Sequence, residues 1–255
     1  AMKLSSFMSS AYPEGNPSSR IKKSRKDMIF SLEDLADRIG ERPDRARVEE
    51  LVGGEASQIE LLLSSQPDKR CAMIWGYVSS LAAERSPLPL RLPARDYVGL
   101  ELAGGSIILE KGRDHVGERM SGGRIKIEGA AGDYLGQEMK GGGIVAAGCR
   151  DYAFRQMKGG WGVVKGDAGK FLGLGNSGGR IAVQGSCRER AGWMMRSGRM
   201  FVRGDAGEYL GLLMSGGEIL VRGEAGRRAG WRSKGGRIAA SRFGPEAADG
   251  ALELG

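Results

Sequence analysis

An alternation of apolar and polar residues recurs along more than half of this chain. It follows each of eight pairs of small residues, as in the Arg-Ile-Lys-Ile-Glu segment at residues 124–128. An apolar residue at every second position is typical of a β-strand with one buried face. The pairs begin 18 or 19 residues apart, which indicates one structural unit that is copied and stacked. Their first residues are Gly104, Gly122, Gly141, Gly159, Gly178, Ser197, Gly216 and Gly235.

Two apolar positions of each unit form columns when the units are aligned. About 19 residues at roughly 3.3 Å each give a contour of about 60 Å, which suits one turn of a narrow solenoid. Propeller blades and helical repeats need a longer period, and leucine-rich repeats need a leucine ladder with a helical segment. The pattern therefore predicts a mainly β chain, a parallel β-helix solenoid of about eight coils with two internal ladders. One ladder is Ile125, Ile144, Gly162, Ile181, Met200, Ile219 and Ile238, and the other is Ile127, Ala146, Val164, Val183, Val202, Val221 and Ala240.

A glycine recurs two residues after the second ladder position. Glycine adopts positive φ without steric cost, so we expect this column to form the structural turns of the solenoid. Its members are Gly129, Gly148, Gly166, Gly185, Gly204 and Gly223.

Composition divides the chain into four parts. Residues 1–28 are rich in Ser, Pro and Gly, end in a basic run and predict a disordered basic tail. Residues 29–95 predict a helical N-terminal region with a proline-containing connector, in which residues 59–65 fit either a helix or a strand. Residues 96–243 form the predicted β-helix repeat domain, and residues 244–255 an acidic C-terminal tail. Because each end of a solenoid exposes unpaired strand edges, we expect the helices to cap the first coil and the tail to shield the last.

The three cysteines, Cys71, Cys149 and Cys187, show no paired spacing, which favours a reducing compartment. No apolar run is long enough to span a bilayer and no secretion signal is evident, so we expect a cytoplasmic protein without membrane contact.

Residues suited to catalysis are sparse. His115 is the only histidine, and no His/Cys cluster has metal-ligand spacing. Acidic residues recur near the glycine column, which favours a turn-forming role over a unique catalytic pair. A glycine-rich segment at residues 204–211 resembles a phosphate-binding loop, but it recurs in several units and no helix follows. We therefore predict no catalytic residue, no metal ligand and no cofactor bound by this chain. The acids considered are Asp133, Asp167, Asp205 and Glu224.

Basic residues give the late coils an excess of positive charge within a net charge of +8. Stacked cations repel without counter-charge, so this face predicts an anionic ligand or an acidic partner, with a solvated surface as the alternative. The candidate residues are Arg180, Arg199, Arg203 and Arg222. Because the helical region is slightly acidic, we do not expect nucleic acid as a partner. The aromatic residues Tyr134, Phe154, Phe171 and Tyr209 fit either corner packing or a partner contact.

The segments at residues 129–142 and 204–217 resemble the Gly-x-x-Gly-x-x-x-Gly repeats of one superfamily. It includes the C subunits of formylmethanofuran dehydrogenase and of the formyltransferase/hydrolase complex and, more distantly, the C-terminal domain of the large subunit of glutamate synthase. The resemblance covers roughly residues 100–240 and implies a right-handed parallel β-helix. Met139, Met195 and Met214, followed by small pairs, make the formyl-group subunits the better match.

The resemblance implies a non-catalytic scaffold subunit of a C1 (formyl-group) transfer complex in one-carbon metabolism. Amidohydrolase-like and formyltransferase-like chains would then be its partners in a multi-subunit enzyme. Two alternatives stay open: a stand-alone scaffold domain of a glutamate-synthase-type amidotransferase, and a partner-binding assembly protein.

Overall fold

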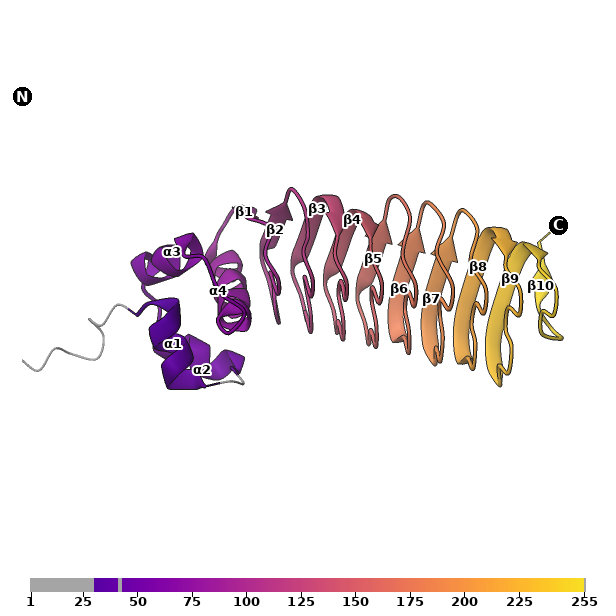
Figure 1. Cartoon of the computed structure of the whole chain (residues 1–255), viewed down its shortest axis with the longest axis horizontal. Helices are drawn as coiled ribbons and strands as arrows, with labels where there is room; N and C mark the ends of the chain where they lie inside the picture. Colours follow the sequence, from indigo (N-terminus) through magenta and orange to yellow (C-terminus); the bar gives the residue numbers. More distant parts are fainter. Residues whose placement is uncertain (1–29, 41–42, 255) are drawn as a thin grey trace, which may run out of the picture.

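The computed structural model describes residues 30–40 and 43–254, and the predicted basic tail at residues 1–28 lies outside them. Four helices gather at one end of an elongated solenoid, and the strands follow one another along its axis (Figure 1). The strands form one sheet in the order β1 to β10, and every neighbouring pair is parallel. This arrangement confirms the predicted parallel β-solenoid of about eight turns.

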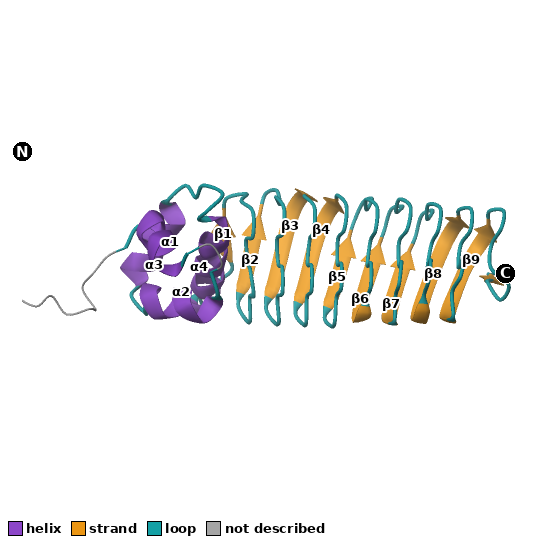
Figure 2. Cartoon of the chain, turned by 60° about the horizontal axis from the view of Figure 1, so that its bottom comes forward, coloured by secondary structure: helices purple, strands orange, loops and turns teal. Residues whose placement is uncertain are grey.

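The strands line one face of the solenoid, and loops close each coil on the other faces (Figure 2). Their bounds are β1 Leu90–Leu92, β2 Ser106–Leu109, β3 Arg124–Ala131, β4 Gly143–Cys149, β5 Trp161–Val164, β6 Ser177–Val183, β7 Ser197–Val202, β8 Ser215–Ala225, β9 Gly235–Phe243 and β10 Leu252–Glu253.

Both predicted ladders are confirmed by the register of the sheet. Ile125 pairs with Ile144 of the next coil, and the column continues residue by residue to Ile238. The second ladder continues in the same way from Ile127 to Ala240. The ladder residues are buried along the whole solenoid and form its apolar core.

The solenoid extends past the predicted limits of residues 96 and 243 at both ends. Leu90 pairs with Ile107, so the connector already contains the first strand. At the other end Leu252 pairs with Ala239, so the acidic segment contains a final partial coil instead of a separate tail. Proline and acid content concealed these strands, because the terminal coils have only one neighbouring coil and tolerate residues that interrupt pairing.

The helices are α1 Leu32–Ile39, α2 Arg45–Val52, α3 Ala56–Ser64 and α4 Ala72–Arg85. Ser31 and Asp34 form the predicted capping box at the start of α1. The segment at residues 59–65, for which the sequence fits either a helix or a strand, belongs to helix α3 and its C-cap Ser65. A short apolar run does not decide between helix and strand, and packing on α4 does so here.

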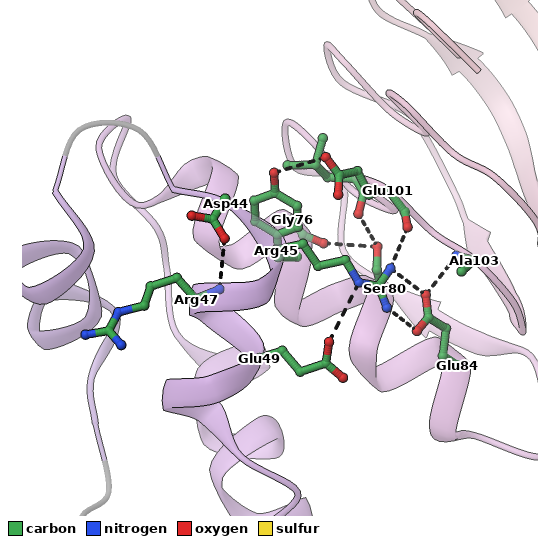
Figure 3. A network of polar contacts seen from close by, with 11 residues as sticks. Asp44, Arg45, Arg47, Glu49, Gly76, Ser80, Glu84, Glu101 and Ala103 are labelled. Atoms are coloured by element: carbon green, nitrogen blue, oxygen red, sulfur yellow. Dashed lines mark hydrogen bonds and ion pairs between the residues drawn. The ribbon is translucent and has the colours of Figure 1, made fainter. Parts of the chain in front are cut away.

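Helix α4 caps the open edge of the first coil by direct hydrogen bonds (Figure 3). The Ser80 hydroxyl donates to Leu100 O at 2.7 Å, and Ser79 Oγ accepts from Gly99 N at 2.9 Å. Gly76 brings the helix close, since a Cβ there would lie 2.5 Å from Tyr97 O. These contacts satisfy backbone groups of the edge that no preceding coil can pair.

A charged pair strengthens the same contact. Arg45 of α2 forms a two-pronged ion pair with Glu84 of α4, and its Nη1 donates to Glu101 O at 2.6 Å. Glu84 Oε1 also accepts from Ala103 N at 2.8 Å. Both side chains are about four-fifths buried, so the pair is less screened than one in open solvent.

The predicted turn glycines are present for a different reason from the one expected. None of the column from Gly129 to Gly223 has positive φ. Gly129 and Gly223 instead lie at register shifts of the sheet, where the strand bends. A Cβ on Gly185 would lie 2.2 Å from Asp167 Oδ1 and 2.7 Å from the Gly166 backbone of the preceding coil. Close approach between coils, and not left-handed backbone, therefore accounts for most of this column.

Left-handed backbone occurs at the small pairs and in the segment before them. The second residue has positive φ in every pair except Gly178-Gly179. At Gly142, for example, a Cβ would lie 2.6 Å from the Met120 side chain one coil earlier. From Gly122 onward the first glycine of a pair faces a carbonyl, since a Cβ on Gly141 would lie 2.2 Å from Ser121 O. The pair is small because the preceding coil already occupies the space on both of its residues.

One coil has glycine at the ladder position and an aromatic residue at a position that is otherwise glycine. Gly162 interrupts the first ladder, and Phe154 occupies a position that is glycine in the neighbouring coils, with φ of 56°. The Phe154 ring is fully buried, and a Cβ on Gly162 would lie 2.2 Å from it. The aromatic ring thus fills the space that isoleucine fills in adjacent coils.

We expect Phe154→Gly to lower the free energy of unfolding by about 3–5 kcal/mol through the cavity it leaves. Gly162→Ile alone is expected to destabilise by overpacking against Phe154. The double variant restores the arrangement of adjacent coils and should be more stable than either single variant. Urea denaturation of all four proteins measures the coupling, and additive losses would contradict this packing account.

Removal of the cap contact should also be measurable. We expect Glu84→Ala to lower the stability of the helical end by about 1–3 kcal/mol, because Ala103 N and Arg45 lose their acceptor. Glu50→Ala is the matched control, since Glu50 pairs with Arg47 on the exposed side of α2 and its loss should cost at most about 0.5 kcal/mol. Urea titration of the helical circular-dichroism signal compares the two, and equal losses would exclude a capping role for Glu84.

Candidate functional site

The outward face of strands β5 to β8 combines an apolar centre with a charged margin. Outward positions alternate with the buried ladder, so Val163, Ala182, Phe201 and Leu220 fall in one row by the register of the sheet. These side chains are half-buried and line a shallow groove of about 300 Å³. Trp161 stands at one end of the groove, with 38% of its surface exposed.

Arginines border this row on both sides. Arg180 and Arg199 pair in register with each other and line the groove. Arg203 and Arg222 follow the buried second ladder and lie exposed at the other margin of the strands. The structure therefore places the four predicted arginines on one face but brings only Arg180 and Arg199 into the groove.

The charge of this face is only partly neutralised. Arg199 Nε lies 3.4 Å from Glu218 Oε2, and both side chains are largely open to solvent. No ion pair within the described residues involves Arg180, Arg203 or Arg222. The groove can therefore accept an apolar group at its centre and an anionic group at its margin.

The apolar centre was not among the predicted site residues. Phe201 and Leu220 fall at outward positions of a strand with one wet face, where polar residues are expected. Their signal in the sequence is that this third position is apolar from Val145 to Ala239, whereas a solvated position would vary in polarity.

The recurring acids hold the turns of successive coils together. Asp133 Oδ1 accepts from Asp151 N at 3.0 Å, and Asp167 Oδ1 accepts from Ser186 N at 2.8 Å. Asp205 Oδ1 accepts from Glu224 N at 2.8 Å. Each of these three aspartates thus accepts from the backbone of the next coil, as a turn-forming role requires. The Glu224 carboxylate instead accepts from the Arg242 guanidinium at 2.7 Å.

His115 belongs to a column of stacked rings. Its ring lies 4.5 Å from that of Tyr97 and 4.8 Å from that of Tyr134, and its Nδ1 lies 2.6 Å from Glu118 Oε2. The column continues through Tyr152 to Phe171. Corner packing is thus confirmed for Tyr134 and Phe171, whereas Phe154 lies in the core instead.

The cysteines of the solenoid are buried thiols in the core. Cys149 and Cys187 occupy the same internal column, two coils apart, and neither forms a disulfide. Burial raises the pKa of both thiols to about 12. The neutral thiol is therefore the form that the folded chain holds at neutral pH.

We expect Cys149 and Cys187 to react with a thiol reagent at pH 8 at least about 10³-fold more slowly in the folded chain than after denaturation. Their raised pKa also means that these two thiols stabilise the fold fully below the unfolded thiol pKa of about 8.5, and that this contribution is lost as the pH rises toward 12. Mass-spectrometric labelling of native and denatured chain tests the first effect. Rapid native labelling of either thiol would contradict its burial.

A search of the described residues for membrane spans found no helix of sufficient length and apolarity. The same part of the chain contains no group of three or more His, Cys, Asp or Glu side chains placed to hold a metal ion. Comparison with protein-family models gave no match, and comparison with curated proteins gave none. The resemblance to the formyl-group subunits thus rests on the repeat motif alone.

Proposed function

We propose that this chain is a non-catalytic scaffold subunit of a C1 (formyl-group) transfer complex, with a partner protein docked on the outward face of β5 to β8. The observation that carries the docking role is the apolar row bordered by Arg180 and Arg199. A protein partner with apolar side chains flanked by carboxylates would match both features.

The fold also uses the chemically versatile side chains for its own cohesion. The recurrent aspartates accept backbone N–H groups, His115 is stacked between two tyrosines, and two cysteines lie in the core. These positive structural roles favour a scaffold over a catalytic subunit. The choice of the formyl-group complex, with amidohydrolase-like and formyltransferase-like partners, comes from the Gly-x-x-Gly-x-x-x-Gly repeats.

Isolation of the native complex tests this assignment. We expect the affinity-tagged chain, purified from its own host at low salt, to retain an amidohydrolase-like and a formyltransferase-like chain identified by mass spectrometry. Retention of a flavoprotein and a glutaminase would instead establish the amidotransferase alternative. A partner-free chain would overturn the scaffold proposal.

Charge reversal on the groove provides the matched comparison within this experiment. Arg180→Glu combined with Arg199→Glu should reduce partner retention at least about tenfold, because the cationic margin becomes repulsive. Arg124→Glu is the control, since Arg124 is exposed in the same column on β3, outside the groove. Equal retention by both variants would show that the partner docks elsewhere.

A further inference from the structure

Along one edge of the solenoid, the coils share the same backbone hydrogen bonds but differ in their side chains. In each coil two edge residues follow the buried position that Gly136 occupies. The backbone N–H of the second edge residue donates to the carbonyl of the first edge residue in the next coil. Glu101 N donates to Glu118 O at 2.8 Å, and Met194 N donates to Leu212 O at the same distance. We call each of these backbone hydrogen bonds between neighbouring coils a rung. The other rungs are Arg119 to Gln137, Glu138 to Arg155, Gln156 to Leu174, Gly175 to Trp193 and Leu213 to Trp231.

The side chains on these rungs change character halfway along the solenoid. The early coils carry charged and amide groups, with Arg119 Nε 3.1 Å from Glu101 Oε1 and Arg155 Nη1 3.0 Å from Gln137 Oε1. The late coils carry aromatic and aliphatic groups at the same positions. We name this late set the edge patch: Leu174, Trp193, Met194, Leu212, Leu213 and Trp231.

Backbone pairing between coils does not account for the edge patch. Two of its residues also pack on corner rings, Trp193 against Phe171 at 5.7 Å and Trp231 against Tyr209 at 5.9 Å between ring centres. The same backbone rungs form in the early coils with polar residues, so the solenoid does not require apolar groups there. Met194, Leu213 and Trp231 leave 46%, 37% and 38% of their surface exposed. A contiguous exposed apolar patch, as opposed to single exposed residues, is typical of an interaction surface.

Cationic side chains border the edge patch. The guanidinium of Arg228 lies 5.0 Å and that of Arg232 4.9 Å from the Trp231 ring centre. Arg228 is neutralised by an ion pair with Glu246, whereas Arg232 belongs to no ion pair within the described residues. Arg196 and Lys234 follow the patch rungs in their own coils and are exposed. The four-residue segments at 174–177, 193–196, 212–215 and 231–234 contain no acidic residue, whereas the early rungs include Glu101, Glu118 and Glu138.

We propose that the edge patch is a second docking surface, which binds an acidic amphipathic segment of a partner protein. Apolar side chains of that segment cover Trp193, Leu213 and Trp231, and its carboxylates face the bordering cations. The patch belongs to the turns between strands and shares no residue with the groove on β5 to β8. The inference is therefore independent of which complex the chain serves.

Charge and extent favour a protein segment over the other occupants. A second copy would bring the same cations, Arg196, Arg232 and Lys234, against one another if the patches met. A flat anionic membrane along this edge would also face Glu101 and Glu138 of the early coils. The patch spans four coils, or roughly 15 Å at about 4.8 Å per step, which matches about ten residues of a helix.

Site-specific photo-crosslinking on the full chain in its own host tests the proposal. A benzophenone amino acid replaces Leu213 in one protein and Glu138, in the same column of an early coil, in the other. We expect a protein crosslink from position 213 alone, to a segment with net negative charge and spaced apolar residues. A synthetic peptide of that segment then serves as the binding probe for the purified full chain.

The peptide should bind the wild-type chain, with affinity that decreases as salt increases. Met194→Glu combined with Leu213→Glu should weaken binding at least tenfold, whereas Gln156→Glu should not. Glutamate occurs at the matched position Glu138, so the fold accepts it, and equal thermal midpoints verify this. Crosslinking to a second copy, to lipid or to a neutral or basic segment would overturn the proposal, as would no crosslink or equal peptide binding by the variants.

Discussion

Backbone pairing between successive coils is the constraint on which this structure depends. Parallel strands repeat at about 4.8 Å, so the backbone of one coil lies in contact with the backbone of the next. Glycine is therefore needed where carbonyls or methionine side chains of the preceding coil approach, as at Gly141 and Gly142. The same pairing leaves an unsatisfied edge at each end of the solenoid. Helix α4 covers the first edge, and the partial coil that contains β10 covers the last.

The periodic part of the fold could be predicted from sequence because one register governs the whole sheet. Each ladder residue has the same environment as its equivalent in the next coil. Aligning the units from Ile125 to Ile238 therefore also predicts which residues of neighbouring strands pair. The reason for the Gly129 column could not be read in this way, since a repeated glycine signals either positive φ or close approach. The terminal strands were missed because their proline and acidic residues depart from the repeat, and only tertiary packing reveals their pairing.

The candidate site was only half predictable for a related reason. The arginines formed visible columns, but a column does not tell which members share a groove. Arg180 and Arg199 do so because the row from Val163 to Leu220 is recessed beside them. Apolar outward residues look like ordinary strand residues in a sequence. Their position on the wet face is what distinguishes them, and it is known only once the buried face has been assigned.

The hydrogen-bonded rungs from one coil to the next have a bearing on how such a chain changes in length. Spacings of 18 and 19 residues coexist in the same sheet, so the loops absorb a single-residue difference without disturbing the strands. Duplication or loss of one complete unit would leave every remaining neighbour relation intact. Each added coil would therefore increase the distance between two surface features by about 4.8 Å and leave the cross-section of the solenoid unchanged.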